Sequence, residues 1–90
     1  MCLGFSCDVK VTDGKVYRNF KKKVCKQGES IKIHSPRNVY KVSFVDPNLL
    51  SVESKKNDPD KMKNDLLGYL NDTLGLRAKK KHLQVLDLKT

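Results

Sequence analysis

Lysine and arginine residues are concentrated in one early stretch of the chain. Residues 14–44 contain nine Lys or Arg side chains and a single acid, Glu29, which gives a formal charge of +8. Guanidinium and ammonium groups bind phosphate oxygens, and each phosphate that they neutralise releases condensed counterions. The stretch therefore predicts an anion-binding region made of Lys15, Arg18, Lys21, Lys22, Lys23, Lys26 and Arg37.

A second basic stretch lies near the end of the chain. Residues 77–90 contain five Lys or Arg residues and one acid, a formal charge of +4, whereas residues 45–76 contain four lysines and six acids. A cation just beyond a helix C-terminus is stabilised by the helix dipole, by about 0.3–1 kcal/mol, and Arg77 alone can fill that role. The other cations exceed this need, so we predict a second anion-binding region made of Arg77, Lys79, Lys80 and Lys81.

Aromatic residues are interleaved with these cations. Proteins that bind single-stranded RNA stack bases on exposed rings next to basic side chains. Tyr17 and Tyr40 are the candidate stacking residues, whereas Phe20 and Phe44 are expected in the core. Residues 37–45 lack the glycine and the ring spacing of the RNA-recognition motif, so no such motif is predicted.

The chain shows no catalytic or metal-binding signature. His34 and His82 are its two histidines, and acid/base cleavage of RNA would require them to meet. Cys2, Cys7 and Cys25 are an odd number, which argues against a disulfide framework, and they lack the paired spacing of a zinc site. We predict reduced thiols, with Cys7 and Cys25 partly buried, and a protein without catalytic residues, metal or cofactor.

Alternation of apolar and polar residues predicts strands at 5–11, 31–33, 39–45, 49–53 and 83–88. Asp13-Gly14 is typical of a hairpin turn. The stretch 15–26 fits both a strand and a helix, because Val16, Phe20 and Val24 share one face in either conformation. Its β-branched residues and the preceding Asp-Gly pair favour a strand.

Residues 58–75 predict a helix. Asp58 is a good N-cap, Pro59 suits the first helical position, and Gly75 is a typical helix end. Gly68 inside the helix costs about 1 kcal/mol relative to alanine, which suggests close packing on the sheet. The apolar side chains form a single stripe: Met62, Leu66, Leu67, Leu70 and Leu74.

Ninety residues are enough for one domain, and a hydrophobic content of 38% with clear patterning indicates a globular fold. We predict a single small basic α+β domain over residues 1–90, with residues 1–4 as a candidate flexible tail. In it, a curved antiparallel sheet of four to six strands packs against one helix at about 58–75. The stripe Leu66, Leu70 and Leu74 would cover Val9, Val11, Val42 and Phe44.

The net charge of +9 and the lack of catalytic motifs favour a non-catalytic binding module. The leading hypothesis is binding of nucleic acid, RNA being favoured, mainly through phosphate contacts. The alternative is a protein-interaction or scaffold domain that self-associates or docks an acidic protein, and a lesser one is a binder of phosphoinositides or acidic membranes. No apolar run reaches the roughly 18 residues that cross a bilayer, so we expect a cytoplasmic or nuclear protein.

Overall fold

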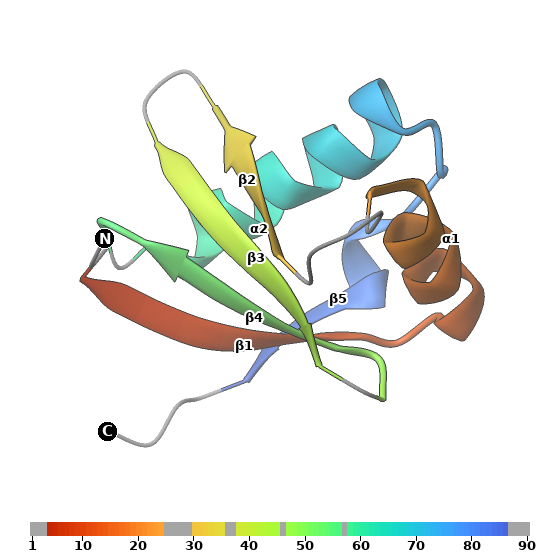
Figure 1. Ribbon diagram of the computed structural model, residues 1–90, viewed down its shortest axis with the longest axis horizontal. Helices are drawn as coiled ribbons and strands as arrows, with labels where there is room; N and C mark the ends of the chain where they lie inside the picture. The colour runs from red at the N-terminus through yellow and green to blue at the C-terminus, as the bar shows by residue number, and fades with distance from the viewer. Residues whose placement is uncertain (1–3, 25–29, 36–37, 46, 57, 87–90) are drawn as a thin grey trace.

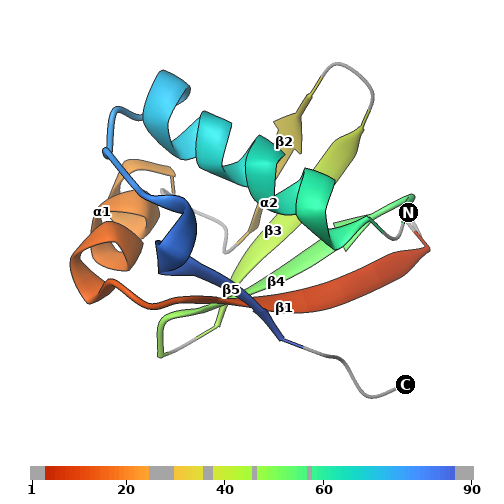
Figure 2. The same cartoon turned by 180° about the vertical axis from the view of Figure 1, so that it is seen from behind.

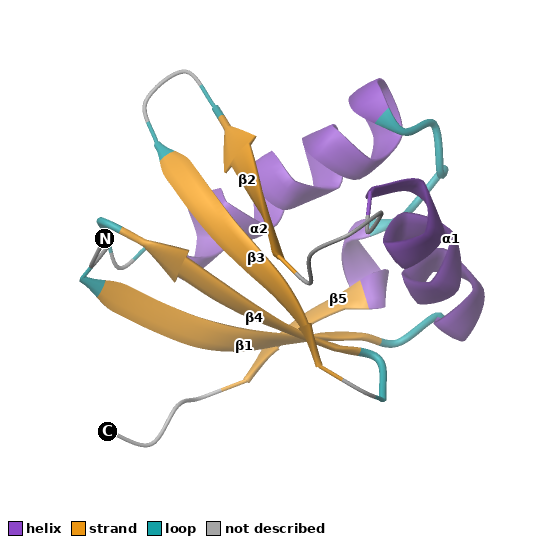
Figure 3. Cartoon of the chain, viewed as in Figure 1, coloured by secondary structure: helices purple, strands orange, loops and turns teal. Residues whose placement is uncertain are grey.

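The computed structural model describes residues 4–24, 30–35, 38–45, 47–56 and 58–86. Two helices, α1 and α2, pack with five strands in these ranges, and the predicted α+β class is confirmed (Figure 3). A π-helical turn, η1, continues α2, and a 3₁₀ turn, η2, precedes the last strand. In chain order the elements are β1 (Phe5–Val11), α1 (Gly14–Val24), β2 (Ser30–His34), β3 (Val39–Val45), β4 (Leu49–Ser54), α2 (Pro59–Gly68), η1 (Tyr69–Thr73), η2 (Lys80–His82) and β5 (Leu83–Leu86).

The five strands form one antiparallel sheet in the order β2-β3-β4-β1-β5. The sheet is curved, with β2 and β5 at its two edges (Figure 1). The first strand of the chain is therefore an interior strand. Val9 of β1 lies opposite Leu50 of β4 on one side and opposite Val85 of β5 on the other.

The core lies on one face of this sheet, which α2 crosses (Figures 1 and 2). The predicted packing of Leu66 from α2 and Leu70 from η1 with Val9, Val11 and Val42 is confirmed, and Leu74 and Phe44 are partly buried beside them. The side chains buried most completely come from every layer of the fold: Val9, Val11, Phe20, Val42, Leu50, Val52, Leu70 and Leu83.

The expected strand over residues 15–26 is wrong, because residues 14–24 form α1 and residues 25–26 lie outside the described ranges. Asp13 does not open a hairpin turn. Its Oδ1 accepts hydrogen bonds from the backbone N–H groups of Lys15 (2.9 Å) and Val16 (3.3 Å), two of the donors that a helix start leaves unpaired. The fold thus has a second helix in addition to the one that the sequence predicts clearly.

The predicted helix at 58–75 is confirmed in its main features. Asp58 caps it by accepting a hydrogen bond from the backbone N–H of Lys61 at 3.1 Å, and Pro59 is the first helical residue. The helical turns end at Thr73, and Gly75 follows with φ +66°, the left-handed conformation that glycine adopts without strain. The predicted strand at 83–88 begins as expected, and residues 87–88 lie outside the described ranges.

Candidate functional site

The exposed face of α1 carries the cations of the first basic stretch. Val16 and Phe20 are buried on the inner face of α1, and Lys15, Arg18 and Lys22 are exposed on the outer face. These three follow one another at intervals of three and four residues, which is the spacing of one helical stripe. At about 1.5 Å per residue the stripe extends roughly 10 Å along the helix axis.

Aromatic packing and the hydroxyl of Tyr17 hold α1 against the sheet. The Phe20 and Phe44 rings meet edge to face, with centroids 4.9 Å apart. The Tyr17 hydroxyl donates to the carbonyl oxygen of Val45 (3.1 Å) or to that of Leu49 (3.3 Å), at the end of β3 and the start of β4. The cationic stripe therefore sits on a helix whose orientation is set by the core.

The predicted role of Tyr17 and Tyr40 as base-stacking residues is wrong. Only 3% of Tyr17 and 4% of Tyr40 is exposed, so neither ring has a free face for a base. The Tyr40 hydroxyl donates to Asp65 Oδ2 at 2.6 Å. A buried tyrosine normally finds such a partner for its hydroxyl, and both residues belong to the core.

The second basic stretch docks beside the start of α1, although the two are far apart in the sequence. The backbone N–H of Thr12 donates to the carbonyl oxygen of His82 at 2.8 Å, and its hydroxyl lies 3.4 Å from the carbonyl oxygen of Lys81. His82 Nε2 lies 3.7 Å from Asp13 Oδ2. Figures 1 and 2 show η2 next to α1 in both views.

An amide clamp fixes the segment that leads into η2. The Asn71 side chain of η1 accepts a hydrogen bond from the backbone N–H of Ala78 (2.6 Å) and donates one to the carbonyl oxygen of Ala78 (2.9 Å). His82 adds a local contact, since its Nδ1 accepts a hydrogen bond from the backbone N–H of Lys79 at 3.1 Å. Lys79 to Lys81 thus follow a backbone that is tied to the rest of the fold.

We use the name basic surface for the exposed cations of α1, those of η2, and Lys79, which directly precedes η2. All of its members are exposed: Lys15, Arg18, Lys22, Lys23, Lys79, Lys80 and Lys81. Asp13 lies beside this group. Its carboxylate accepts hydrogen bonds from the backbone N–H groups of Val16 and Lys15, and these bonds hold the pKa of Asp13 below its ordinary value. The carboxylate is therefore ionised and engaged as a helix cap at neutral pH.

The other predicted anion-binding residues are not all part of this surface. Lys21 is half-buried, and Arg77 is exposed in the loop after η1, where its φ of +57° is unusual for a residue with a side chain. Lys26 and Arg37 lie outside the described ranges. The structure therefore places η2 beside the start of α1, through the contacts of Thr12 and Asp13 with residues 81–82.

The two histidines lie at opposite edges of the sheet. His34 ends β2, and His82 immediately precedes β5. Three strands, β3, β4 and β1, separate these two edges, so the histidines are not neighbours in the sheet.

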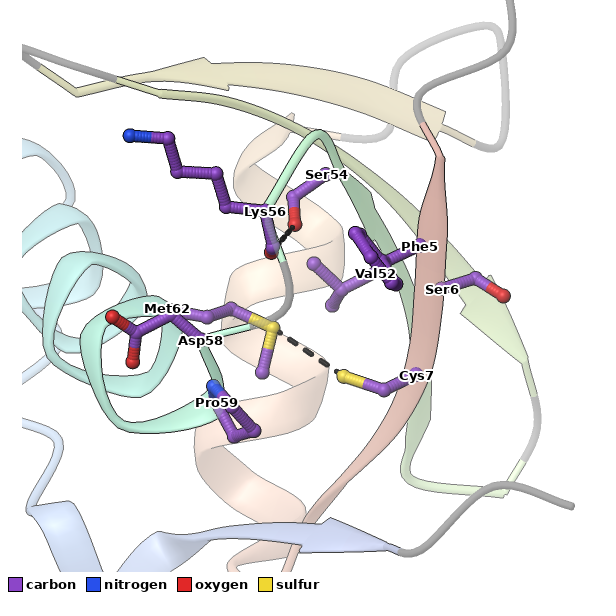
Figure 4. A pocket seen from close by; sticks show the side chains of 9 residues that line it. All are labelled: Phe5, Ser6, Cys7, Val52, Ser54, Lys56, Asp58, Pro59 and Met62. Atoms are coloured by element: carbon purple, nitrogen blue, oxygen red, sulfur yellow. Dashed lines mark hydrogen bonds between the residues drawn. The ribbon is translucent and has the colours of Figure 1, made fainter.

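A small cavity of about 20 Å³ lies where β1 and β4 meet the start of α2 (Figure 4). Such a volume holds about one water molecule. The Cys7 thiol lies against it, half-buried as predicted, with Sγ 3.5 Å from Met62 Sδ. Burial, and to a lesser degree the charge of Asp8, raises the pKa of this thiol, which makes it a poor nucleophile and metal ligand.

The described part of the chain holds no group of three or more His, Cys, Asp or Glu residues that could bind a metal ion. Cys2 and Cys25, which were considered as ligands, lie outside the described ranges. No helix in those ranges is both long and apolar enough to cross a bilayer.

Sequence reasoning missed the residues that assemble the basic surface. Asp13 had a recognisable signal, since an aspartate directly before an amphipathic stripe is typical of a helix N-cap. Asn71 and His82 had none, because their partners are Ala78 and Asp13, and only the folded chain brings His82 near Asp13.

Comparisons of the chain with protein-family models, with curated proteins and with solved structures found no match.

Proposed function

We propose that this protein is a non-catalytic nucleic-acid-binding module that uses the basic surface to contact phosphates, with duplex RNA as the favoured ligand. One observation carries the proposal. Two cationic segments, about 60 residues apart in the sequence, meet on one side of the fold through the contacts of Thr12 and Asp13 with residues 81–82.

The chemistry of this surface suits phosphate contacts better than base reading. Its side chains are lysines and one arginine, which bind phosphate oxygens but carry little sequence information at the backbone. Duplex RNA is recognised mostly by its shape and by contacts to phosphates and 2′-hydroxyls. Because Tyr17 and Tyr40 are buried, stacking on single-stranded bases no longer supports the proposal.

The test is a fluorescence-anisotropy titration of labelled duplex RNA, single-stranded RNA and duplex DNA at about 50 and 200 mM salt. We expect binding to duplex RNA that weakens steeply with salt. Each phosphate contact contributes about 0.7–0.9 to the slope of log affinity against log salt concentration. A heparin-like polyanion is the control for unspecific attraction.

Three double variants with the same change in net charge locate the contacts. Arg18→Gln with Lys22→Gln alters α1, Lys80→Gln with Lys81→Gln alters η2, and Lys55→Gln with Lys56→Gln is the control. The control pair is exposed and directly follows β4, whose end lies away from α1, whereas its start contacts α1 through Tyr17 (Figure 1).

We expect the α1 and η2 pairs each to lower the salt slope by about 1.4–1.8, and the control pair to leave it unchanged. Equal losses in all three variants would show that only total charge matters. Absence of binding at low salt would contradict the proposal and would favour an acidic protein surface, self-association or an acidic membrane. Light scattering and anionic vesicles then separate these alternatives.

A further inference from the structure

A groove of about 270 Å³ runs between the end of β2 and the helix formed by α2 and η1. On the strand side it is lined by Ile33, His34 and Ser35, and on the helix side by six residues between Asn64 and Thr73. Its volume is slightly below the roughly 300–1,000 Å³ typical of small-molecule pockets, and the groove is open rather than enclosed. This shape suits a chain that lies across it better than a compact ligand.

Gly68 on the helix side of the groove has no internal structural reason to be glycine. Its φ of −59° and ψ of −42° are ordinary helical values. Among the described residues, a Cβ added there would meet only Asp72 Oδ2, at 3.9 Å, which is normal van der Waals contact. The expected close packing of Gly68 on the sheet is thus wrong. Glycine in a helix also allows another backbone to approach closely, and the groove is the space that it opens.

The helix changes its hydrogen-bonding pattern at the same place. Directly after Gly68, residues Tyr69–Thr73 form a π-helical turn. Such turns are rare and occur frequently at functional sites. Tyr69, Asp72 and Thr73 of this turn line the groove, so the irregular part of the helix faces the open space.

The strand side of the groove is a free sheet edge. In the described sheet β2 pairs with β3 alone. The N–H of Ser35 donates to the carbonyl oxygen of Asn38 at 2.8 Å, which makes these two a hydrogen-bonded pair. Because such pairs alternate along an antiparallel ladder, the backbone N–H and C=O groups of Lys32 and His34 point away from β3. They can pair with an added strand.

The groove is acidic, in contrast to the chain as a whole. The described residues that line it include Asp65 and Asp72 and neither lysine nor arginine. Asp65 is held in place from the core, since the Tyr40 hydroxyl donates to Oδ2 at 2.6 Å and Asn38 Nδ2 lies 3.3 Å from that hydroxyl. Within the described ranges no side chain pairs with Asp65 Oδ1 or with the exposed Asp72 carboxylate, so both can accept from a cationic ligand.

We propose that this groove binds an extended lysine- or arginine-containing segment of a partner protein, which adds to β2 as a further antiparallel strand. The partner's backbone pairs with Lys32 and His34, and its basic side chains reach Asp65 and Asp72. Gly68 lets the segment lie close to the helix. The site is separate from the basic surface and does not depend on the proposed nucleic-acid function.

The probe is a capped peptide of sequence Thr-Lys-Val-Lys-Val-Thr, followed by backbone NMR of the labelled full-length chain at up to about 1 mM peptide. We expect shift changes confined to residues 32–35 and 64–73. The matched peptide Thr-Glu-Val-Glu-Val-Thr should not bind. Methylation of alternate backbone nitrogens of the lysine peptide removes the hydrogen-bond donors along one edge of the strand that the peptide forms. There are two such methylated peptides, one for each set of alternate nitrogens. One of the two should bind at least about tenfold more weakly than the unmethylated peptide.

Two variants test the groove itself. Asp72→Asn removes one carboxylate from an exposed position, so the fold is kept, and it should weaken binding by about two- to fivefold. Gly68→Leu fills the groove and should abolish binding. Asp60→Asn, in the first turn of α2 and outside the groove lining, is the charge-matched control and should bind as the parent does.

The proposal is overturned if neither peptide changes the spectrum, or if the shifts map to β5 or to the basic surface. It is also overturned if Asp72→Asn and Asp60→Asn weaken binding equally, or if a folded Gly68→Leu protein binds as the parent does. If duplex RNA changes the spectrum at residues 64–73 as strongly as the peptide does, the ligand of the groove would be a nucleic acid and not a partner protein.

Discussion

The basic surface and the groove differ in almost every physical property. The basic surface consists of exposed cations on α1 and η2, and the capping Asp13 lies beside it. The groove is hollow, is lined by two aspartates and borders a free strand edge. The basic surface offers many exposed charges. The groove offers a recess and backbone hydrogen-bonding groups, with fewer charges.

This difference predicts two kinds of binding. Contacts to phosphates depend steeply on salt, because their free energy comes largely from released counterions. Strand addition depends on directional backbone hydrogen bonds, which salt affects much less. We therefore expect binding at the basic surface to weaken with salt much more steeply than binding at the groove.

The largest expected effect comes from the one ring that packs between the two regions. Phe20 is fully buried, contacts Phe44 and lies 6.2 Å, centroid to centroid, from Tyr69 at the groove. Phe20→Ala should lower the free energy of unfolding by about 3–5 kcal/mol, as measured by urea denaturation. Both surfaces should weaken together. Loss of nucleic-acid binding with an unchanged peptide site would show that the regions are independent.

A smaller effect should separate the two surfaces. Asn71→Ala removes the clamp on Ala78, a residue only 6% exposed, and leaves its backbone N–H and C=O without their partner. We expect a loss of about 1–3 kcal/mol in unfolding free energy and a weaker contribution of Lys79 to Lys81 to RNA binding.

Asn64→Ala on the same helix is the control for this prediction, because Asn64 is exposed. If Asn71→Ala leaves the salt slope of RNA binding unchanged, the clamp does not position the second cationic segment. Fluorescence anisotropy gives the salt slope of RNA binding, and urea denaturation of the same samples gives the free energy of unfolding.

Gly68→Ala should have a still smaller effect, and in the opposite direction. The added methyl group meets no atom of the described residues closer than 3.9 Å, so the protein should become more stable by about 0.5–1 kcal/mol. RNA affinity should not change, because Gly68 lines the groove and is not part of the basic surface. A destabilised variant would show that the fold itself requires glycine there.

The smallest expected effect is a spectroscopic one at high pH. Burial, and next the hydrogen bond to Asp65, raises the pKa of Tyr40 to about 12. Since the folded chain favours the neutral phenol, this contribution to stability is complete below pH 10 and is lost as the pH rises through about 12. Tyr40→Phe should remove the last tyrosinate absorbance step. Persistence of that step would place the raised pKa on another tyrosine.

Local patterns predicted much of the architecture. The N-cap Asp58, the leucine stripe and Gly75 were enough for the second helix, and alternation was enough for β1, β3 and β4. The segment 14–24 could not be decided in this way. Val16, Phe20 and Val24 are four residues apart, and that spacing suits a period of two and a period of 3.6 equally well.

Charge blocks and short-range periodicity are properties of neighbouring residues, so the amino-acid order reveals them directly. The meeting of Thr12 with His82, the place of β1 between β4 and β5, and the groove between β2 and α2 all join residues that are distant along the chain. Such contacts form because the whole apolar surface must be buried at once, and no local pattern encodes them. Folding thus places the start of one basic stretch beside the other, although they are distant in the sequence, and it forms an acidic groove elsewhere.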